Sequence, residues 1–128
     1  MENISLTRAE EQVMNYLWGL EKAVLKDIVD RFPEPKPAYT TVSTVIRVLV
    51  KKGVIGYKTY GKTNHYFPLL SKDKYFKGKL KPIISNYFNG SVSGFASYFA
   101  NQNMDLTELQ EIKELIDERI KKLKRKRN

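Results

Sequence analysis

Apolar residues recur with the period of an α-helix in three segments of the first half of the chain. The first two helices are expected over residues 7–19 and 23–32, and each has an apolar stripe typical of a helix that packs on a core. Thr7 and Glu10 have the spacing of a capping box, and Gly19 is expected to end the first helix. The proline-rich residues 33–37 then predict a rigid turn, because proline cannot continue a helix.

The third helix is expected over residues 38–53, "AYTTVSTVIRVLVKKG". Its first turns are rich in β-branched and hydroxyl residues, which have weak helix propensity. Gly53 predicts a left-handed C-terminal cap. An apolar stripe runs along one side of this helix and has to stabilise it by packing on a core; it consists of Val42, Val45, Ile46, Leu49 and Val50.

A β-hairpin is expected next, because residues 54–60 and 63–69 are rich in Val, Ile, Tyr, Thr and Phe and flank the short turn "YGKT". Two helices, a turn, a third helix and a hairpin form the order of a winged helix-turn-helix, in which the third helix reads DNA and the hairpin is the wing. We therefore expect a mostly α fold with a small β-hairpin and a winged helix-turn-helix DNA-binding domain over residues 1–70.

Three further helical segments follow Leu70, at residues 71–88, 91–100 and 105–128. Pro82 is expected to kink or restart the first, and Thr107 with Gln110 to form a capping box in the last. Short amphipathic helices bury their stripes poorly alone, which predicts a helical dimerisation domain over residues 71–128, with a basic tail, in a homodimer. The residues expected at the dimer interface are Phe76, Ile83, Ile84, Tyr87, Phe88, Leu109, Ile112, Ile116 and Ile120.

The distribution of charge points to a partner. The 128 residues include 23 Lys and Arg against 14 Asp and Glu, and the net charge of +9 favours a polyanion. Residues 33–81 hold eleven basic and two acidic residues, a net charge of +9, whereas residues 1–32 hold four basic and six acidic ones, a net charge of −2. Positive charge is therefore concentrated where a winged helix would meet a duplex.

Hydroxyl and basic residues occupy the side of the third helix opposite its apolar stripe. Short hydroxyls allow close approach to the major groove, and an arginine can reach a base edge or a phosphate. Basic and polar residues near the hairpin tip can lie along phosphates or enter the minor groove. The expected DNA-binding residues are Thr40, Thr41, Ser43, Thr44, Arg47, Lys51, Lys58, Tyr60, Lys62 and Asn64.

The sequence contains few residues suited to catalysis, metal binding or cofactor binding. There is no cysteine, a single histidine and no nucleotide-binding, zinc-protease or nucleophile-elbow motif, so we expect no metal site, no cofactor and no enzyme. No apolar run approaches the roughly 20 residues that span a membrane, and the polar first residues do not resemble a signal peptide. A cytoplasmic protein without stable membrane insertion is expected.

Two alternative functions stay open. The winged helix could bind protein or RNA, as this fold does in other proteins. The basic C-terminal helix could instead associate with anionic membranes. Its seven basic residues between Arg119 and Arg127 either complement the macrodipole of a solvated helix end or form a weak nonspecific clamp, and we favour the first.

Three stretches of the chain resemble the signatures of the penicillinase-repressor family: "LTRAEEQVMNYLW", "AYTTVSTVIRVLVKKGVI" and "YGKTNHYFPL". The resemblance implies a homodimeric winged-helix repressor on a palindromic operator, with the C-terminal helices as the dimer interface. It also implies a wing at residues 58–64. The residues that it implies at DNA-reading positions are Thr40, Thr41, Thr44 and Arg47.

Two departures from that family concern its signals. In the β-lactam-responsive members, a membrane sensor system leads to cleavage at an Asn-Phe bond, and the matching place here is Tyr98-Phe99. The copper-responsive branch carries C-terminal cysteines, which this chain lacks. The resemblance implies an upstream sensor system, but these two departures argue against inactivation by that cleavage and against copper sensing through thiolates. The inducing signal stays open.

Overall fold

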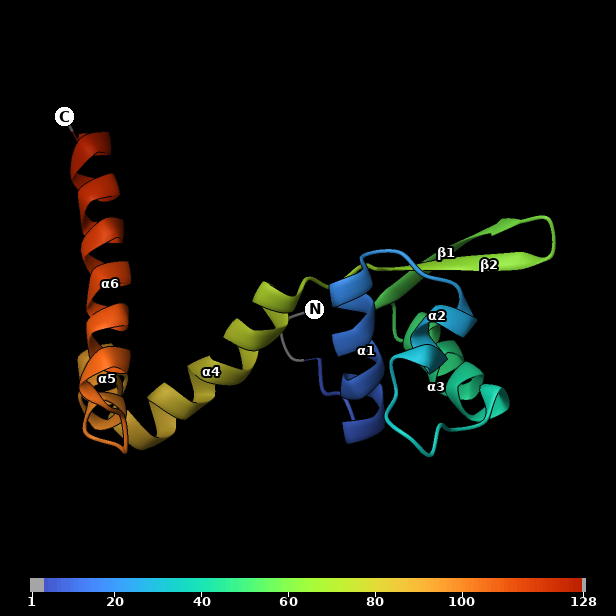
Figure 1. Cartoon of the computed structure of the whole chain (residues 1–128), viewed down its shortest axis with the longest axis horizontal. Helices are drawn as coiled ribbons and strands as arrows, with labels where there is room; N and C mark the ends of the chain where they lie inside the picture. The colour runs from blue at the N-terminus through green and yellow to red at the C-terminus, as the bar shows by residue number, and fades with distance from the viewer. Residues whose placement is uncertain (1–3, 128) are drawn as a thin grey trace. The chain divides into compact units, whose positions relative to one another are not determined.

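The computed structural model describes residues 4–127, which form two compact units, one ending at Lys81 and the other beginning at Pro82 (Figure 1). Most of the described chain is helical, and its one sheet is a two-stranded antiparallel hairpin. The predicted fold class is therefore confirmed. The domain boundary expected after Leu70 stays a prediction.

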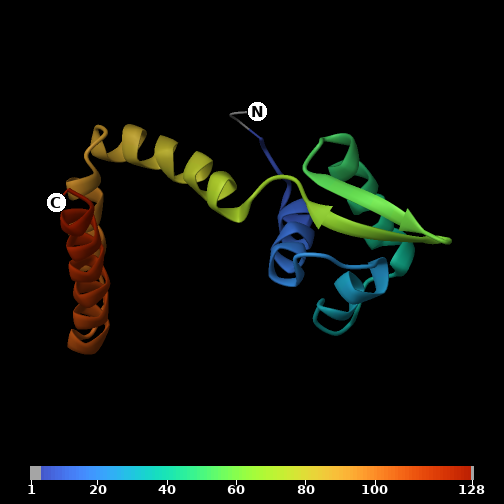
Figure 2. The same ribbon diagram turned by 90° about the horizontal axis from the view of Figure 1, so that it is seen from above.

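The first unit has the element order of a winged helix. In both views of the ribbon the tip of the hairpin projects past the helices of this unit (Figures 1 and 2). Its elements are α1 (Arg8–Leu20), α2 (Leu25–Asp30), α3 (Tyr39–Lys51), β1 (Ile55–Tyr60), β2 (Thr63–Pro68) and the first turns of α4 (Lys72–Phe88).

The core of the first unit lies where α1, α2 and α3 meet, next to the start of the hairpin. Three residues of the α3 stripe, Val42, Ile46 and Leu49, are buried in it, while Val45 and Val50 pack against its edge. Packing on this core offsets the weak propensity of the first turns of α3. Gly53 follows α3 with a φ of 80°, as predicted for its left-handed cap.

The capping box of α1 is confirmed, but its end is not. The N–H of Glu10 donates to Oγ1 of Thr7 at 3.2 Å, and the N–H of Thr7 donates to Oε1 of Glu10 at 2.9 Å. The helix continues through Gly19 to Leu20, because Glu21 takes the positive φ of 67° that reverses the chain.

The second helix is shorter than the predicted residues 23–32. Ala23 and Tyr66 form an antiparallel bridge, with the N–H of Ala23 donating to the carbonyl of Tyr66 at 2.9 Å and the reverse bond at 2.8 Å. Ala23 is thus extended alongside β2, and α2 begins only at Leu25. This bridge ties the end of α1 to the wing.

The hairpin has the bounds expected from its composition to within one residue. Tyr60 pairs with Thr63, so Gly61 and Lys62 form a two-residue loop. Gly61 has a φ of 63°, the feature that a type II′ turn requires at its first central position.

The first turns of α4 pack on α1 within the first unit. The hydroxyl of Tyr75 donates to Oε2 of Glu11 at 2.6 Å, and Nζ of Lys79 lies 3.0 Å from the same oxygen. The ring of Trp18 lies 5.7 Å from that of Tyr75, and its Nε1 donates to the carbonyl of Leu70 at 2.8 Å. We call Glu11, Trp18, Tyr75 and Lys79 the α1–α4 lock.

Proline does not restart α4. The helix runs from Lys72 to Phe88 with Pro82 inside it, so of the two expected effects the restart is wrong and the kink stays a prediction. Pro82 has no N–H to donate to the carbonyl of Gly78 one turn earlier.

The second unit contains the end of α4, α5 (Val92–Ala100) and α6 (Leu106–Arg127). Phe88 contacts Phe95 and Tyr98 with ring centroids 5.6 and 5.9 Å apart, which joins α4 to α5. The capping box predicted at Thr107 is wrong, because Oδ1 of Asp105 accepts from the N–H of Glu108 at 2.8 Å and Thr107 lies inside the helix. No residue of α5 or α6 is buried.

Candidate nucleic-acid interface

One face of α3 is accessible along its whole length. The buried residues of α3 recur every three or four positions, as the helical period requires, and the residues between them face away from the core. On the accessible face Ser43 is half-buried, and the exposed residues are Thr40, Thr41, Thr44, Arg47 and Lys51. The α3 residues that sequence analysis assigned to DNA thus share one surface.

The start of α3 has no side-chain cap. Ala38 precedes the helix in an extended conformation, and its carbonyl accepts from the N–H groups of Thr41 and Val42. The first N–H groups of a helix lack intrahelical acceptors and lie at the positive end of its macrodipole. With the hydroxyls of Thr40 and Thr41 beside them, they are suited to hold a phosphate.

Thr44 is restricted in what it can offer a base. Its Oγ1 donates to the carbonyl of Thr40 at 2.9 Å, so the hydroxyl proton is already used inside α3. The oxygen can still accept a hydrogen bond, and the exposed methyl group can contact a thymine methyl.

The cations of this face and of the wing are free of carboxylate partners. Within residues 4–127, Arg47, Lys51, Lys58 and Lys62 form no ion pair. All four are exposed. Their charges can therefore meet phosphates or base edges without first breaking an ion pair of the described chain.

Asn64 has a structural role in the wing. Oγ1 of Thr59 donates to its Oδ1 at 2.6 Å, and its Nδ2 lies 3.4 Å from the hydroxyl of Tyr66. These contacts leave a single amide N–H of this half-buried side chain for a partner.

Tyr60 is exposed and is held by two neighbours. Its ring meets His65 edge to face at 4.9 Å, and Nζ of Lys22 lies 5.5 Å from the ring centroid. Lys22 was not among the residues predicted from the sequence, and it reaches the wing because Ala23 bridges to Tyr66. No local pattern around Lys22 could have indicated this.

An ion pair between the exposed Lys52 and the buried Glu10 holds the end of α3, and neither residue was among the site residues predicted from the sequence. Nζ of Lys52 lies 2.7 Å from Oε1 of Glu10 and 3.3 Å from the carbonyl of Ser5, which joins the residue after α3 to the start of α1. Burial alone would raise the pKa of Glu10, but the hydrogen bonds from Lys52 and from the backbone of Thr7 outweigh it and lower the pKa below 4.5.

The predicted dimer residues lie in both units. Phe76 belongs to the first unit and is exposed, whereas the others belong to the second. In the second unit the exposed residues are Ile83, Tyr87, Ile116 and Ile120, and the half-buried ones are Ile84, Phe88, Leu109 and Ile112. Among residues 4–127, none of the helices combines the length and the apolar composition needed to cross a membrane.

Comparison with known proteins identifies one family. The family described as penicillinase repressor matches residues 6–118. The penicillinase repressor of Staphylococcus aureus is 26% identical over 125 residues, which cover 94% of this chain and 98% of that protein. The penicillinase repressor of Bacillus licheniformis is 19% identical over 115 residues, covering 88% of this chain and 90% of that protein.

A solved DNA-binding domain is similar in fold to part of this chain. The solution structure of the DNA-binding domain of the repressor BlaI is similar with a TM-score of 0.50 and 22% identity. The similarity covers 59% of this chain and 94% of that domain.

Proposed function

This chain belongs to the penicillinase repressor family, and on that premise we propose that it is a homodimeric, sequence-specific transcriptional repressor that binds a palindromic operator. Family membership supports a DNA-binding repressor and not an enzyme. The homodimer, the palindrome and the DNA-contacting residues are our extension of that statement.

The exposed face of α3 is the main support for the proposal that this helix binds in the major groove. The major groove of B-DNA admits an α-helix and presents a distinct pattern of donors and acceptors at each base pair. Thr40 and Thr41, beside the uncapped start of α3, are suited to fix the helix on a phosphate. Arg47 lies deeper along the same face and has the reach for O6 and N7 of a guanine.

The wing supplies the second contact. Lys58 and Lys62 are exposed on the hairpin, and Lys62 lies in its two-residue loop. Cations at this position can follow the phosphates or enter the minor groove, where they add affinity with little sequence preference. We therefore assign base reading to α3 and electrostatic anchoring to the wing.

The second unit supports the homodimer. Its helices bury none of their large apolar residues, and exposed apolar surface of this kind is typical of an interface between copies. A two-fold dimer would present two copies of α3 to half-sites about 34–36 Å apart on one side of a duplex. A palindromic operator mirrors that symmetry.

Arg47→Ala tests the assignment. With a duplex that carries the palindrome upstream of the gene, we expect the variant to lose about 1–3 kcal/mol of binding free energy and to tolerate substitutions at one operator position. The loss should be larger on this duplex than on a scrambled one. Fluorescence anisotropy titrations at several salt concentrations measure both.

Arg8→Ala is the matched control, because Arg8 is an exposed arginine outside α3 and the wing. It should change binding little. An equal loss on palindromic and scrambled duplexes would reassign Arg47 to a phosphate. If the wild type lacks a preference of about 10³-fold or more for the palindrome, the sequence-specific repressor is contradicted.

A further inference from the structure

The C-terminal end of α6 carries a charge cluster that the proposed operator contacts do not use. Of the nine residues from 119 to 127, seven are Lys or Arg and none is acidic. All seven basic residues are exposed, and within residues 4–127 none of them forms an ion pair. Their charge is therefore not neutralised by the described chain itself.

Compensation of the helix macrodipole does not account for the whole cluster. Its favourable effect falls off within the last turn, and Lys121 and Lys122 precede the last turn of α6. Like charges four residues apart destabilise a helix, and Lys121 with Arg125 forms such a pair. An anion bound between Lys121 and Arg125 would remove the repulsion of this pair.

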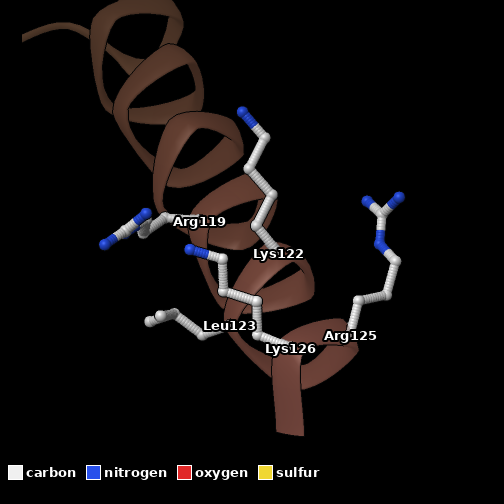
Figure 3. Close-up of a pocket in the computed structure, with 5 residues that line it drawn as sticks. All are labelled: Arg119, Lys122, Leu123, Arg125 and Lys126. Carbon is white, nitrogen blue, oxygen red and sulfur yellow. The ribbon is translucent and has the colours of Figure 1, made fainter. Parts of the chain in front are cut away.

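A second copy of the chain is not the occupant of this surface. The apolar stripe of α6 includes Ile116, Ile120 and Leu123, and helical spacing places Lys121 and Arg125 on the side away from it. Leu123 and Arg125 extend from opposite sides of the helix (Figure 3). A partner helix that covers the stripe would leave these cations exposed.

A membrane surface fits less well than a nucleic acid. An interfacial helix inserts an apolar face, usually with aromatic residues, into the lipid. Residues 106–127 contain no aromatic residue, and residues 124–127 are cations on every side of the helix. Duplex DNA needs only positive charge, because it carries one negative charge per about 1.7 Å of its axis.

We propose that Lys121, Lys122 and Arg125 form a second, sequence-independent DNA contact that binds phosphates of the duplex flanking the operator. The contact rests on the proposed function, since operator binding brings the chain to that duplex. It adds affinity and salt dependence without adding base preference.

The test compares a duplex that ends at the palindrome with one extended by about one helical turn of unrelated sequence on each side. The full chain should bind the extended duplex more tightly, with a steeper fall of log K against log salt. The triple variant Lys121→Gln, Lys122→Gln, Arg125→Gln should bind the extended duplex no more tightly than the minimal one. The slope of log K against log salt should become less steep by about 0.9 for each phosphate that is no longer neutralised. Affinity for the minimal duplex should stay unchanged.

The matched control is Lys121→Arg, Lys122→Arg, Arg125→Lys, which keeps every charge and should keep the gain from the flanks. A gain that survives in the glutamine variant overturns the proposal, and so does the absence of any gain in the wild type. Loss of the dimer in that variant, seen by sedimentation, would also overturn it by assigning these cations to the dimer interface.

Binding to vesicles that contain anionic lipid tests whether a membrane, and not DNA, is the partner of these cations. If the vesicles retain the wild type but not the glutamine variant, and the flanks add nothing, a membrane replaces DNA and the proposal is overturned. The same assays distinguish failure of this contact from failure of the proposed repressor function. If the repressor function fails, the wild type shows no preference for the minimal palindromic duplex over a scrambled duplex of the same length.

Discussion

Lys51 and Lys52 are adjacent lysines with different surroundings. Lys52 pairs with the buried carboxylate of Glu10, whereas Lys51 is exposed and forms no ion pair among residues 4–127. Lys52 therefore fixes the end of α3 against α1, which leaves Lys51 free on the face that we assign to DNA. Removing Lys52 would be costly, because the buried carboxylate of Glu10 would be left without its cation.

Glu10→Gln should lower the free energy of unfolding at neutral pH by about 1–2 kcal/mol, because an amide is a weaker acceptor for the ammonium of Lys52. In the folded protein the pKa of Glu10 is lowered from its ordinary value. Its carboxylate thus contributes stability that is present above the ordinary pKa and is lost as the pH falls through the lowered, folded pKa. The loss of stability on acidification should be smaller in the variant.

Urea unfolding, followed by the fluorescence of Trp18, the single tryptophan, measures the free energy of unfolding of wild type and variant at neutral and acidic pH. Glu34→Gln is the control, since Glu34 is exposed in the turn before α3. Equal acid sensitivity of wild type and Glu10→Gln would show that Glu10 does not contribute.

At the scale of elements, the α1–α4 lock makes the first turns of α4 part of the first unit. Tyr75→Phe removes the hydroxyl that donates to Glu11 and keeps the ring beside Trp18. Removing this hydrogen bond to a charged group should cost about 1–2 kcal/mol of unfolding free energy. The same substitution should raise the pKa of Glu11, which the Tyr75 hydrogen bond and then that from Lys79 lower.

Tyr57→Phe is the control for that variant, because Tyr57 is an exposed tyrosine of the same unit. Unfolding by urea gives both free energies, and titration of the Glu11 carboxyl by NMR gives the pKa. A loss in Tyr75→Phe no larger than in Tyr57→Phe would contradict the contribution of the lock.

Elements with local signals were predictable from the sequence. The capping box of α1, the stripe of α3 and the left-handed Gly53 each depend on residues a few positions apart. The start of α2 was not predictable in this way, because Ala23 pairs with Tyr66, far along the chain. The cap of α6 was predicted at Thr107, but Asp105 supplies it, and aspartate is a stronger N-cap than threonine.

The candidate interface was predictable to the same extent. Helical period alone places Thr40, Thr44 and Arg47 on one face of α3. It cannot show that the hydroxyl of Thr44 bonds to the backbone or that Thr59 holds Asn64, because both depend on side-chain conformation.

At the scale of the whole molecule, the two units differ in what they bury. Among residues 4–127, every buried hydrophobic side chain lies at or before Tyr75. The second unit is a short piece of chain without a core of its own, and such pieces usually need an oligomer to be stable. We therefore expect the wild type to sediment as a dimer and its unfolding to depend on protein concentration.

Ile116→Asp should raise the dissociation constant of that dimer about a hundredfold, because it replaces apolar contact by an unpaired charge at a cost of about 3 kcal/mol. Gln110→Glu is the control, since helical spacing places Gln110 opposite the apolar stripe. Sedimentation equilibrium measures both variants. An unchanged dissociation constant in Ile116→Asp would exclude this stripe from the interface.

The unburied stripe of α6 would also make repression sensitive to dosage. Apolar residues covered only by a second copy are protected in proportion to the concentration of the chain. In the proposed function, operator occupancy would depend on the same dimer, whose amount varies with the square of the monomer concentration when the dimer is scarce. A fall in synthesis would thus lower both the folded fraction of the chain and the occupancy of the operator. A modest reduction in the amount of protein would then be enough to release the regulated genes.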